Sequence, residues 1–157
     1  MKIGILTFHC AHNYGAVLQC YALQETLKAM GHEVEVIDHR PEFLLSPYKV
    51  WNIRRGKSCN SFLKRLVLEC LTLPRRIARY KTFDLFIRTR LCLTREKTIP
   101  SSFDAYIIGS DQVWNPRITK GFHLPYFGYF EFQKGSKKYI AYAASMEASS
   151  LSQEAKD

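Results

Sequence analysis

The stretch FDAYIIGSDQVWNP, residues 103–116, decides the fold of this chain. Its apolar run, residues 105–108, is short and bounded by turn residues, which is typical of a strand buried on both faces of a parallel sheet. Gly109 is expected to end that strand. Polar and aromatic residues follow, namely Ser110, Asp111, Gln112, Trp114 and Asn115. Pro116 restricts Asn115 to extended backbone, which opposes a direct continuation into helix.

The polar cluster after this strand is the expected functional site. In an open α/β sheet, ligands bind in the crevice beyond the carboxyl ends of the strands. An alternative stays open: Asp111 and Asn115 only cap and turn the backbone, and Trp114 packs as core. Turns favour Asp and Asn for purely local reasons.

Residues 1–38 predict a βαβ unit. Residues 2–8 read as a strand, and apolar residues then recur with helical period over 16–30 until Gly31 stops the helix. Residues 33–38 alternate apolar and acidic side chains and read as a second strand. The parallel pairing of the two strands requires a right-handed crossover.

The turn between the first strand and its helix contains Asn13 and Gly15. Backbone N–H groups at a helix N-terminus point outward, so this turn suits a phosphate or a carboxylate. The G-x-G-x-x-G fingerprint is missing, which leaves dinucleotide binding poorly supported. Asp38 ends the second strand, at the position where dinucleotide-binding folds carry an acid that binds the ribose. Because the glycines of the fingerprint are missing, we treat this agreement as a coincidence.

Residues 39–101 predict a variable, basic and helical insertion. Between Lys49 and Lys97 the sequence has 14 Lys and Arg against three acidic residues. We expect an irregular segment over 39–60, a helix over 61–73 that Pro74 stops, and a second helix over 75–91. A basic block of this kind suits nucleic acid, an anionic membrane surface or anionic substrates. A solvated helical face is favoured, and no nucleic-acid partner is expected because the stacking signatures are missing.

The C-terminal part predicts one more strand. Residues 117–134 read as an aromatic-rich loop, whose rings either line a sugar-binding cleft or anchor the loop to the core. Residues 138–143 read as a strand, and a helix is expected to start near Ser150.

Composition indicates one globular domain. The chain has 157 residues, 46% of them hydrophobic, and no run approaches the roughly 18 apolar residues of a membrane span. Its five cysteines are odd in number and form no C-x-x-C pair, which predicts reduced thiols in a cytoplasmic protein, with no disulfide framework and no metal site. Cys10 as a nucleophile beside His9 and His12 is disfavoured, because sequence neighbours seldom form such a pair.

Three stretches together resemble the polysaccharide pyruvyl transferase family: KIGILTFHCAHNYGAVLQCYALQETLKAMGHEVEVID, FDAYIIGSDQVWNP and KKYIAYAAS. The resemblance implies a transferase that moves a pyruvyl group from phosphoenolpyruvate to hydroxyls of a sugar, forming a ketal on a cell-surface polysaccharide or exopolysaccharide. It also implies a fold similar to GT-B glycosyltransferases, with the active site between two Rossmann-like halves. Residues 1–157 correspond to the N-terminal Rossmann-like domain, and the C-terminal domain is expected to be absent.

The resemblance assigns roles to the polar residues at the two strand exits. Asp111 is the expected catalytic residue, as the general base for the acceptor hydroxyl. The expected substrate-binding residues are Asn13, Gly15, Ser110, Gln112, Trp114 and Asn115. Trp114 would stack on a sugar face, and the helix start at Gly15 would receive an anion. The implied partners are phosphoenolpyruvate as donor and a glycan or lipid-linked sugar as acceptor, with no cofactor and with peripheral contact of the basic helices on an anionic membrane.

Two rival functions stay open. A GT-B-type nucleotide-sugar glycosyltransferase half has the same broad architecture, and fold alone does not fix function. A non-catalytic module that docks a partner chain through the basic helices is the second rival.

Overall fold

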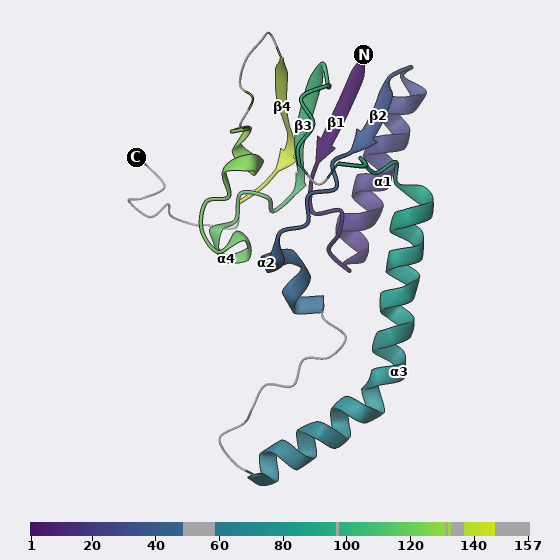
Figure 1. Cartoon of the computed structure of the whole chain (residues 1–157), viewed down its shortest axis with the longest axis vertical. Coiled ribbons are helices and arrows are strands. Elements are labelled where there is room, and N and C mark those ends of the chain that lie inside the picture. Colours follow the sequence, from purple (N-terminus) through teal and green to yellow (C-terminus); the bar gives the residue numbers. More distant parts are fainter. Residues whose placement is uncertain (49–58, 97, 131, 133–136, 147–157) are drawn as a thin grey trace.

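The protein is built on one parallel sheet. The computed structural model describes residues 1–48, 59–96, 98–130, 132 and 137–146. Within them, four strands pair in the order β2-β1-β3-β4, and all three pairings are parallel. The strands are β1 (Lys2–Leu6), β2 (Glu33–Val36), β3 (Ala105–Asp111) and β4 (Lys138–Ala144). This sheet with its flanking helices confirms the predicted α/β, Rossmann-like fold class (Figure 1).

β3 lies between β1 and β4 and is buried over six of its seven residues. The prediction that Gly109 ends this strand is wrong, because β3 continues to Asp111, which pairs with Ala144. The strand continues with an unusual backbone: Gly109 has φ +122° and Ser110 has φ +59°. A Cβ at Gly109 would lie 2.4 Å from the Tyr142 carbonyl oxygen, so only glycine fits here.

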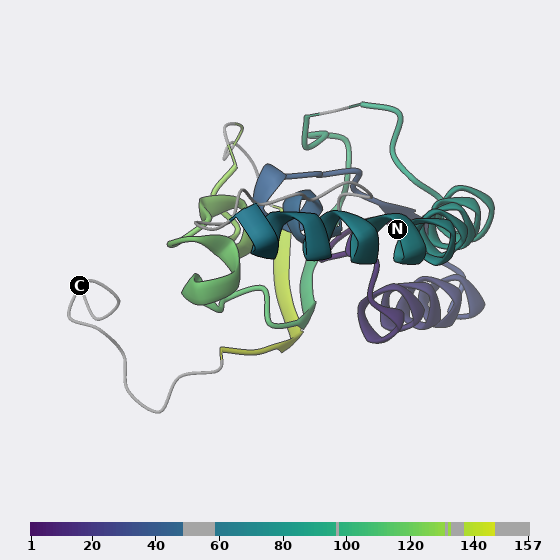
Figure 2. The same ribbon diagram turned by 90° about the horizontal axis from the view of Figure 1, so that it is seen from below.

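Two helices cover one face of the sheet. They are α1 (Tyr14–Ala29) and α3 (Cys59–Arg90), which lie side by side in Figure 2. The buried cluster on this face combines strand residues with helix residues: Ile3, Ile5, Val36 and Ile107 with Val17, Cys20, Leu23, Phe83 and Ile87. The helical period of the sequence thus identifies part of the buried stripe of each helix, whereas Met30, Ile77 and Tyr80, which share the period, are exposed.

The prediction of two helices separated at Pro74 is wrong. The structure has one helix from Cys59 to Arg90 with Pro74 inside it. A proline in a helix interior removes one hydrogen bond and bends the axis without always ending the helix. α3 is bent along its length in Figure 1 and projects beyond the sheet.

Several short helices occur where irregular segments were expected. α2 (Glu42–Leu45) and η1 (Ser46–Tyr48) follow β2. α4 (Pro116–Thr119) and η2 (Leu124–Phe127) lie in the stretch that was expected to be a loop. Asn115 is extended as predicted, yet a helix begins directly after it, because proline suits the first helical position. The helix expected from Ser150 lies outside the described residues.

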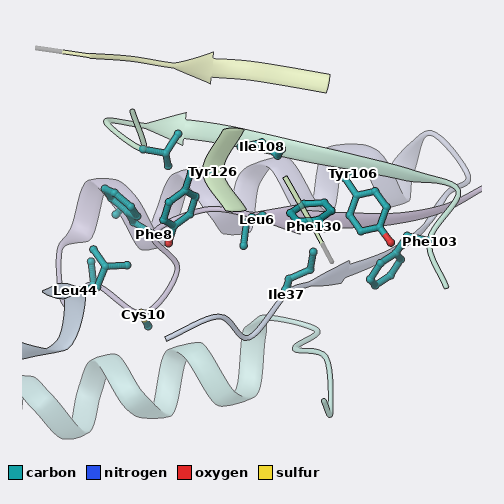
Figure 3. Packing of buried hydrophobic residues seen from close by; sticks show 13 residues of the cluster. Leu6, Phe8, Cys10, Ile37, Leu44, Phe103, Tyr106, Ile108, Tyr126 and Phe130 are labelled. Atoms are coloured by element: carbon teal, nitrogen blue, oxygen red, sulfur yellow. The ribbon is translucent and has the colours of Figure 1, made fainter. Parts of the chain in front are cut away.

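The second face of the sheet is covered by α2, η2 and the aromatic segment around them. Leu6, Phe8 and Ile108 from the strands and their exits pack with Tyr126 and Phe130 (Figure 3). The rings of Phe8 and Tyr126 meet edge to face, with centroids 5.2 Å apart. The aromatics of residues 122–132 therefore act at least in part as anchors of this segment to the core.

β4 forms an exposed edge of the sheet. Residues 138–143 form a strand as predicted, and their side chains are exposed. In the part of the chain that the structure describes, no helix is both long enough and apolar enough to cross a membrane.

Candidate active site

The candidate site lies at the edge of the sheet where the carboxyl ends of β1, β2 and β3 meet. The strands are parallel, so the segments that leave them, residues 7–13, 37–41 and 112–116, gather at this one edge. α2 and α4 lie at the same edge in Figure 1. The structure thus brings the two predicted groups of site residues to a common edge and adds a third group, from the exit of β2.

At the exit of β1, Asn13 and Gly15 are engaged with each other. Asn13 is the N-cap of α1, and its Oδ1 accepts a hydrogen bond from the Gly15 N–H at 2.9 Å. This is ordinary N-terminal capping, and it occupies the N–H group that was expected to receive an anion. Substrate binding by these two residues stays a prediction.

At the exit of β3, Ser110 and Asp111 have groups that are not used within the fold. The Ser110 hydroxyl is fully buried and has no hydrogen-bond partner among the described residues. The half-buried Asp111 accepts a hydrogen bond on Oδ1 from the Gln112 N–H at 2.7 Å, and no contact holds Oδ2 in the described part of the chain. A carboxylate with one oxygen held and the other unengaged is geometrically suited to accept a proton.

The other three predicted residues form a structural network. Asn115, 2% exposed, donates from Nδ2 to Gln112 Oε1 at 2.7 Å and accepts from the Arg117 N–H at 3.0 Å. Trp114 donates from Nε1 to the Tyr126 carbonyl at 2.7 Å and stacks on the ring of Phe127. These contacts favour the capping and packing alternative, so sugar binding by Gln112, Trp114 and Asn115 stays a prediction.

The exit of β2 supplies residues that sequence reasoning missed. Asp38 Oδ1 lies 2.9 Å from His9 Nε2 and accepts a hydrogen bond from Arg40 Nε at 2.6 Å. Despite desolvation by burial, the hydrogen bonds from His9 and Arg40 hold the pKa of Asp38 at about 2. Asp38 is therefore ionised at neutral pH and fixes Arg40 at the edge of the site. The available signal was Asp38 itself, set aside because the glycine fingerprint was missing.

A pair of histidines joins the exit of β2 to the segment after α4. Nε2 of His39 lies 2.7 Å from Nε2 of His123. Burial, followed by the charge of His123, lowers the pKa of His39 to about 4, and burial also lowers the pKa of His123. Both rings are thus neutral at pH 7, and one donates to the other. The two residues are 84 positions apart, so no local pattern could pair them.

His12 and Arg79 link the exit of β1 to α3. Arg79 Nη2 donates to the His12 carbonyl at 2.8 Å. The His12 ring is stacked on Phe83, with centroids 5.3 Å apart, and meets Tyr80 edge to face. Burial lowers the pKa of His12, and the nearby charges of Arg79 and Arg40 lower it further against the opposing effect of Asp84. One arginine of the basic block therefore reaches the site.

The acidic and basic side chains named at this edge are Asp38 and Asp111 on one side and Arg40 and Arg79 on the other. Within the described residues, no three His, Cys, Asp or Glu side chains gather as a metal ion would require. Burial raises the pKa of Cys10 to about 11, so this thiol stays protonated and is a poor nucleophile, as expected. The cysteines whose side chains are described, Cys10, Cys20, Cys70 and Cys92, are all free.

Comparison with known proteins identifies the family. The family model described as polysaccharide pyruvyl transferase matches residues 13–157, which is nearly the whole chain. No curated protein and no solved structure matches the chain. The family match confirms the resemblance drawn from the three sequence stretches. The chain therefore belongs to the polysaccharide pyruvyl transferase family, which makes it a transferase.

Proposed function

We propose that this chain carries the acceptor side of a pyruvyl transferase site. It transfers a pyruvyl group from phosphoenolpyruvate to hydroxyls of a sugar residue in a cell-surface polysaccharide or exopolysaccharide. The observation that carries the proposal is Asp111, half-buried at the carboxyl end of β3, with one carboxylate oxygen held and the other without a partner in the described part of the chain. The family match supports the reaction class.

The proposed reaction forms a ketal. Two sugar hydroxyls add to C2 of phosphoenolpyruvate, the C2–O bond to phosphate breaks, and C3 gains a proton to become a methyl group. One hydroxyl proton balances the gain at C3 and the other leaves with inorganic phosphate. Asp111 accepts the proton of the attacking hydroxyl, because Oδ2 has no partner among the described residues and open α/β sheets bind ligands beyond the carboxyl ends of their strands.

The charges around the site support an anionic donor. Asp38 holds Arg40 by its Nε atom, and within the described residues no contact occupies the two terminal nitrogens of the guanidinium group, which could therefore bind an external carboxylate or phosphate. Further donor contacts come, in this proposal, from a second Rossmann-like half, as in the GT-B-like arrangement. A cytoplasmic location fits the free thiols, and the basic side of α3 supports contact with an anionic membrane surface.

The test is Asp111→Asn in the product of the whole coding region. We expect kcat for phosphoenolpyruvate-dependent pyruvylation to fall at least about a hundredfold, the usual size of general-base catalysis, with an unchanged urea midpoint. Asp104→Asn is the matched control, because Asp104 precedes the same strand at the opposite edge of the sheet, where it accepts from the Lys2 N–H. Equal losses of activity and stability in Asp111→Asn would support a purely structural role.

The rivals have their own readouts. Competition by a nucleotide sugar instead of phosphoenolpyruvate would favour the glycosyltransferase half. Stabilisation by a partner polypeptide, with no effect of either small molecule, would favour the binding module.

A further inference from the structure

His9 is a buried histidine whose ring bonds to a charged group at the carboxyl edge of the sheet. Its Nε2 lies 2.9 Å from Asp38 Oδ1. Asp38 is ionised at neutral pH, and an ionised carboxylate only accepts hydrogen bonds, so the His9 nitrogen donates. On the other side of the ring, Nδ1 lies 3.4 Å from the Thr7 carbonyl oxygen, which is too far for a strong hydrogen bond. The bond to Asp38 is therefore the strong polar contact of this ring among the described residues.

The Asp38 carboxylate joins this buried ring to Arg40. The same oxygen, Oδ1, accepts the bond from His9 and the bond from Arg40 Nε at 2.6 Å. Exposure rises along this series of contacts, because the side chain of His9 is 0% exposed, that of Asp38 27% and that of Arg40 34%. The contacts thus run outward from the core, through a carboxylate, to a cation at the edge of the site.

The position of His9 in this series allows it to order Arg40. An arginine side chain that reaches the surface loses rotamer freedom when it is held in one position. The Asp38 backbone N–H donates to Thr94 Oγ1 at 3.0 Å, but this bond fixes the main chain and leaves the carboxylate free to rotate. His9 restricts that rotation, because its ring is held in the close-packed interior.

The alternative is a purely structural role, in which His9 joins the exits of β1 and β2 without any effect on Arg40. Two observations favour a role through Arg40. The His9 bond ends on the oxygen that holds Arg40, and within the described residues no contact occupies the terminal nitrogens of Arg40. A guanidinium group that is already ordered binds a carboxylate or phosphate with a smaller loss of entropy than a mobile one.

We propose that His9 is a positioning residue, which acts through Asp38 to hold Arg40 in place for the anionic group of the donor. This inference rests on the proposed function, in which Arg40 binds phosphoenolpyruvate. His9 itself does not touch the substrate, because its side chain is completely buried. Arg40 binds the donor before and during the reaction, so a loss of its order raises KM and leaves kcat unchanged.

The first test follows the Arg40 Nε–H signal by ¹⁵N-edited NMR in the product of the whole coding region. Arg40→Lys identifies this signal by its disappearance. His9→Leu should speed its exchange with water at least about tenfold, the value of one hydrogen bond to a charged group. His9→Gln should keep the exchange within about threefold of the native rate, because the Gln amide nitrogen reaches a position close to that of Nε2 and donates in its place.

The second test measures kcat and the KM for phosphoenolpyruvate in the same variants. His9→Leu should raise KM about tenfold while kcat changes less than about twofold, and His9→Gln should restore most of the affinity. In a protein that already carries Arg40→Gln, His9→Leu should change KM by less than about twofold, because the group on which His9 acts is missing.

Thr94→Val is the matched control. Thr94 is buried and bonds to the same aspartate, but through the backbone N–H of Asp38 instead of the carboxylate. Thr94→Val should lower the urea midpoint while KM stays within about twofold of the native value. If His9→Leu does not fold, His9→Asn takes its place, because the shorter amide puts its nitrogen where Nδ1 was and does not reach Asp38.

Two results would overturn the inference. One is an Arg40 signal that exchanges at the native rate in the folded His9 variant. The other is a rise in KM that is equally large with and without Arg40, which indicates a structural disturbance. If the Arg40 signal changes as expected and KM does not, His9 still positions Arg40, and the donor role of Arg40 in the proposed function is wrong. Failure of the positioning and failure of the proposed function are therefore distinguishable.

Discussion

Substitution of Ser110 tests whether a residue at the carboxyl end of β3 lowers the stability of the protein while contributing to its activity. Its hydroxyl is fully buried without a partner among the described residues, and its backbone has φ +59°. An unsatisfied buried hydroxyl costs about 1–3 kcal/mol, and the void left by removing one oxygen atom returns part of this. Ser110→Ala should therefore raise the free energy of unfolding by about 1 kcal/mol.

The assay is urea denaturation followed by far-UV circular dichroism, with kcat/KM for pyruvylation measured on the same preparations. With a slope of about 2 kcal/mol per molar urea, the midpoint should rise by about 0.5 M. If the hydroxyl binds substrate, kcat/KM should fall about five- to tenfold, the value of one hydrogen bond.

Thr119→Val is the control for Ser110→Ala. Its buried hydroxyl donates a hydrogen bond to the Asn115 carbonyl at 3.0 Å, so its removal should lower stability by about 1–2 kcal/mol. A loss of 1 kcal/mol or more in Ser110→Ala, with unchanged kcat/KM, would refute the reasoning, because it would mean that the hydroxyl has a stabilising partner and no substrate.

Other substitutions test the scaffold around the site. Gly109→Ala should cost at least about 3 kcal/mol of unfolding free energy in urea, because its Cβ would meet the Tyr142 carbonyl at 2.4 Å; a loss below 1 kcal/mol would contradict this. Gln24→Leu should cost about 2–3 kcal/mol in the same assay, since it unpairs two backbone groups at the end of α3, whereas Gln24→Glu should restore part of the loss. The pKa of His39 beside His123 is lowered to about 4 in the folded protein. Below about pH 6.5, His39 therefore binds a proton in the unfolded chain but stays neutral in the folded one, which favours unfolding. Stability should therefore drop by about 2 kcal/mol from pH 7 to pH 5, and His39→Phe should remove most of that drop.

The fold was predictable where local pattern and burial coincide. The apolar run at residues 105–108 predicted the central strand, and the helical period after Asn13 predicted α1, because each pattern directly matches a buried face. The end of β3 and the continuity of α3 through Pro74 were not predictable. Glycine and proline permit more than one backbone course, and tertiary packing selects among them.

The site was predictable only in part. The residues after β3 could be found because they form one dense polar run. Asp111 Oδ2 has no partner among the described residues, and the catalytic role of Asp111 stays a prediction. Gln112 and Asn115 carry the same kind of side chain yet bond to each other. A sequence shows which groups are available for hydrogen bonds, but their partners depend on the folded geometry.

The sequence by itself determined the class of fold and the family, and it predicted the edge of the sheet that carries the candidate site, because hydrophobic periodicity, strand exits and motifs are local features of the chain. Only the tertiary structure decided which distant groups meet. It joined His9 and Arg40 through Asp38 and brought Arg79 from α3 to the carbonyl of His12. Such contacts depend on how the helices are positioned against the sheet. Side-chain packing across the whole domain fixes that position, and no local stretch of sequence encodes it.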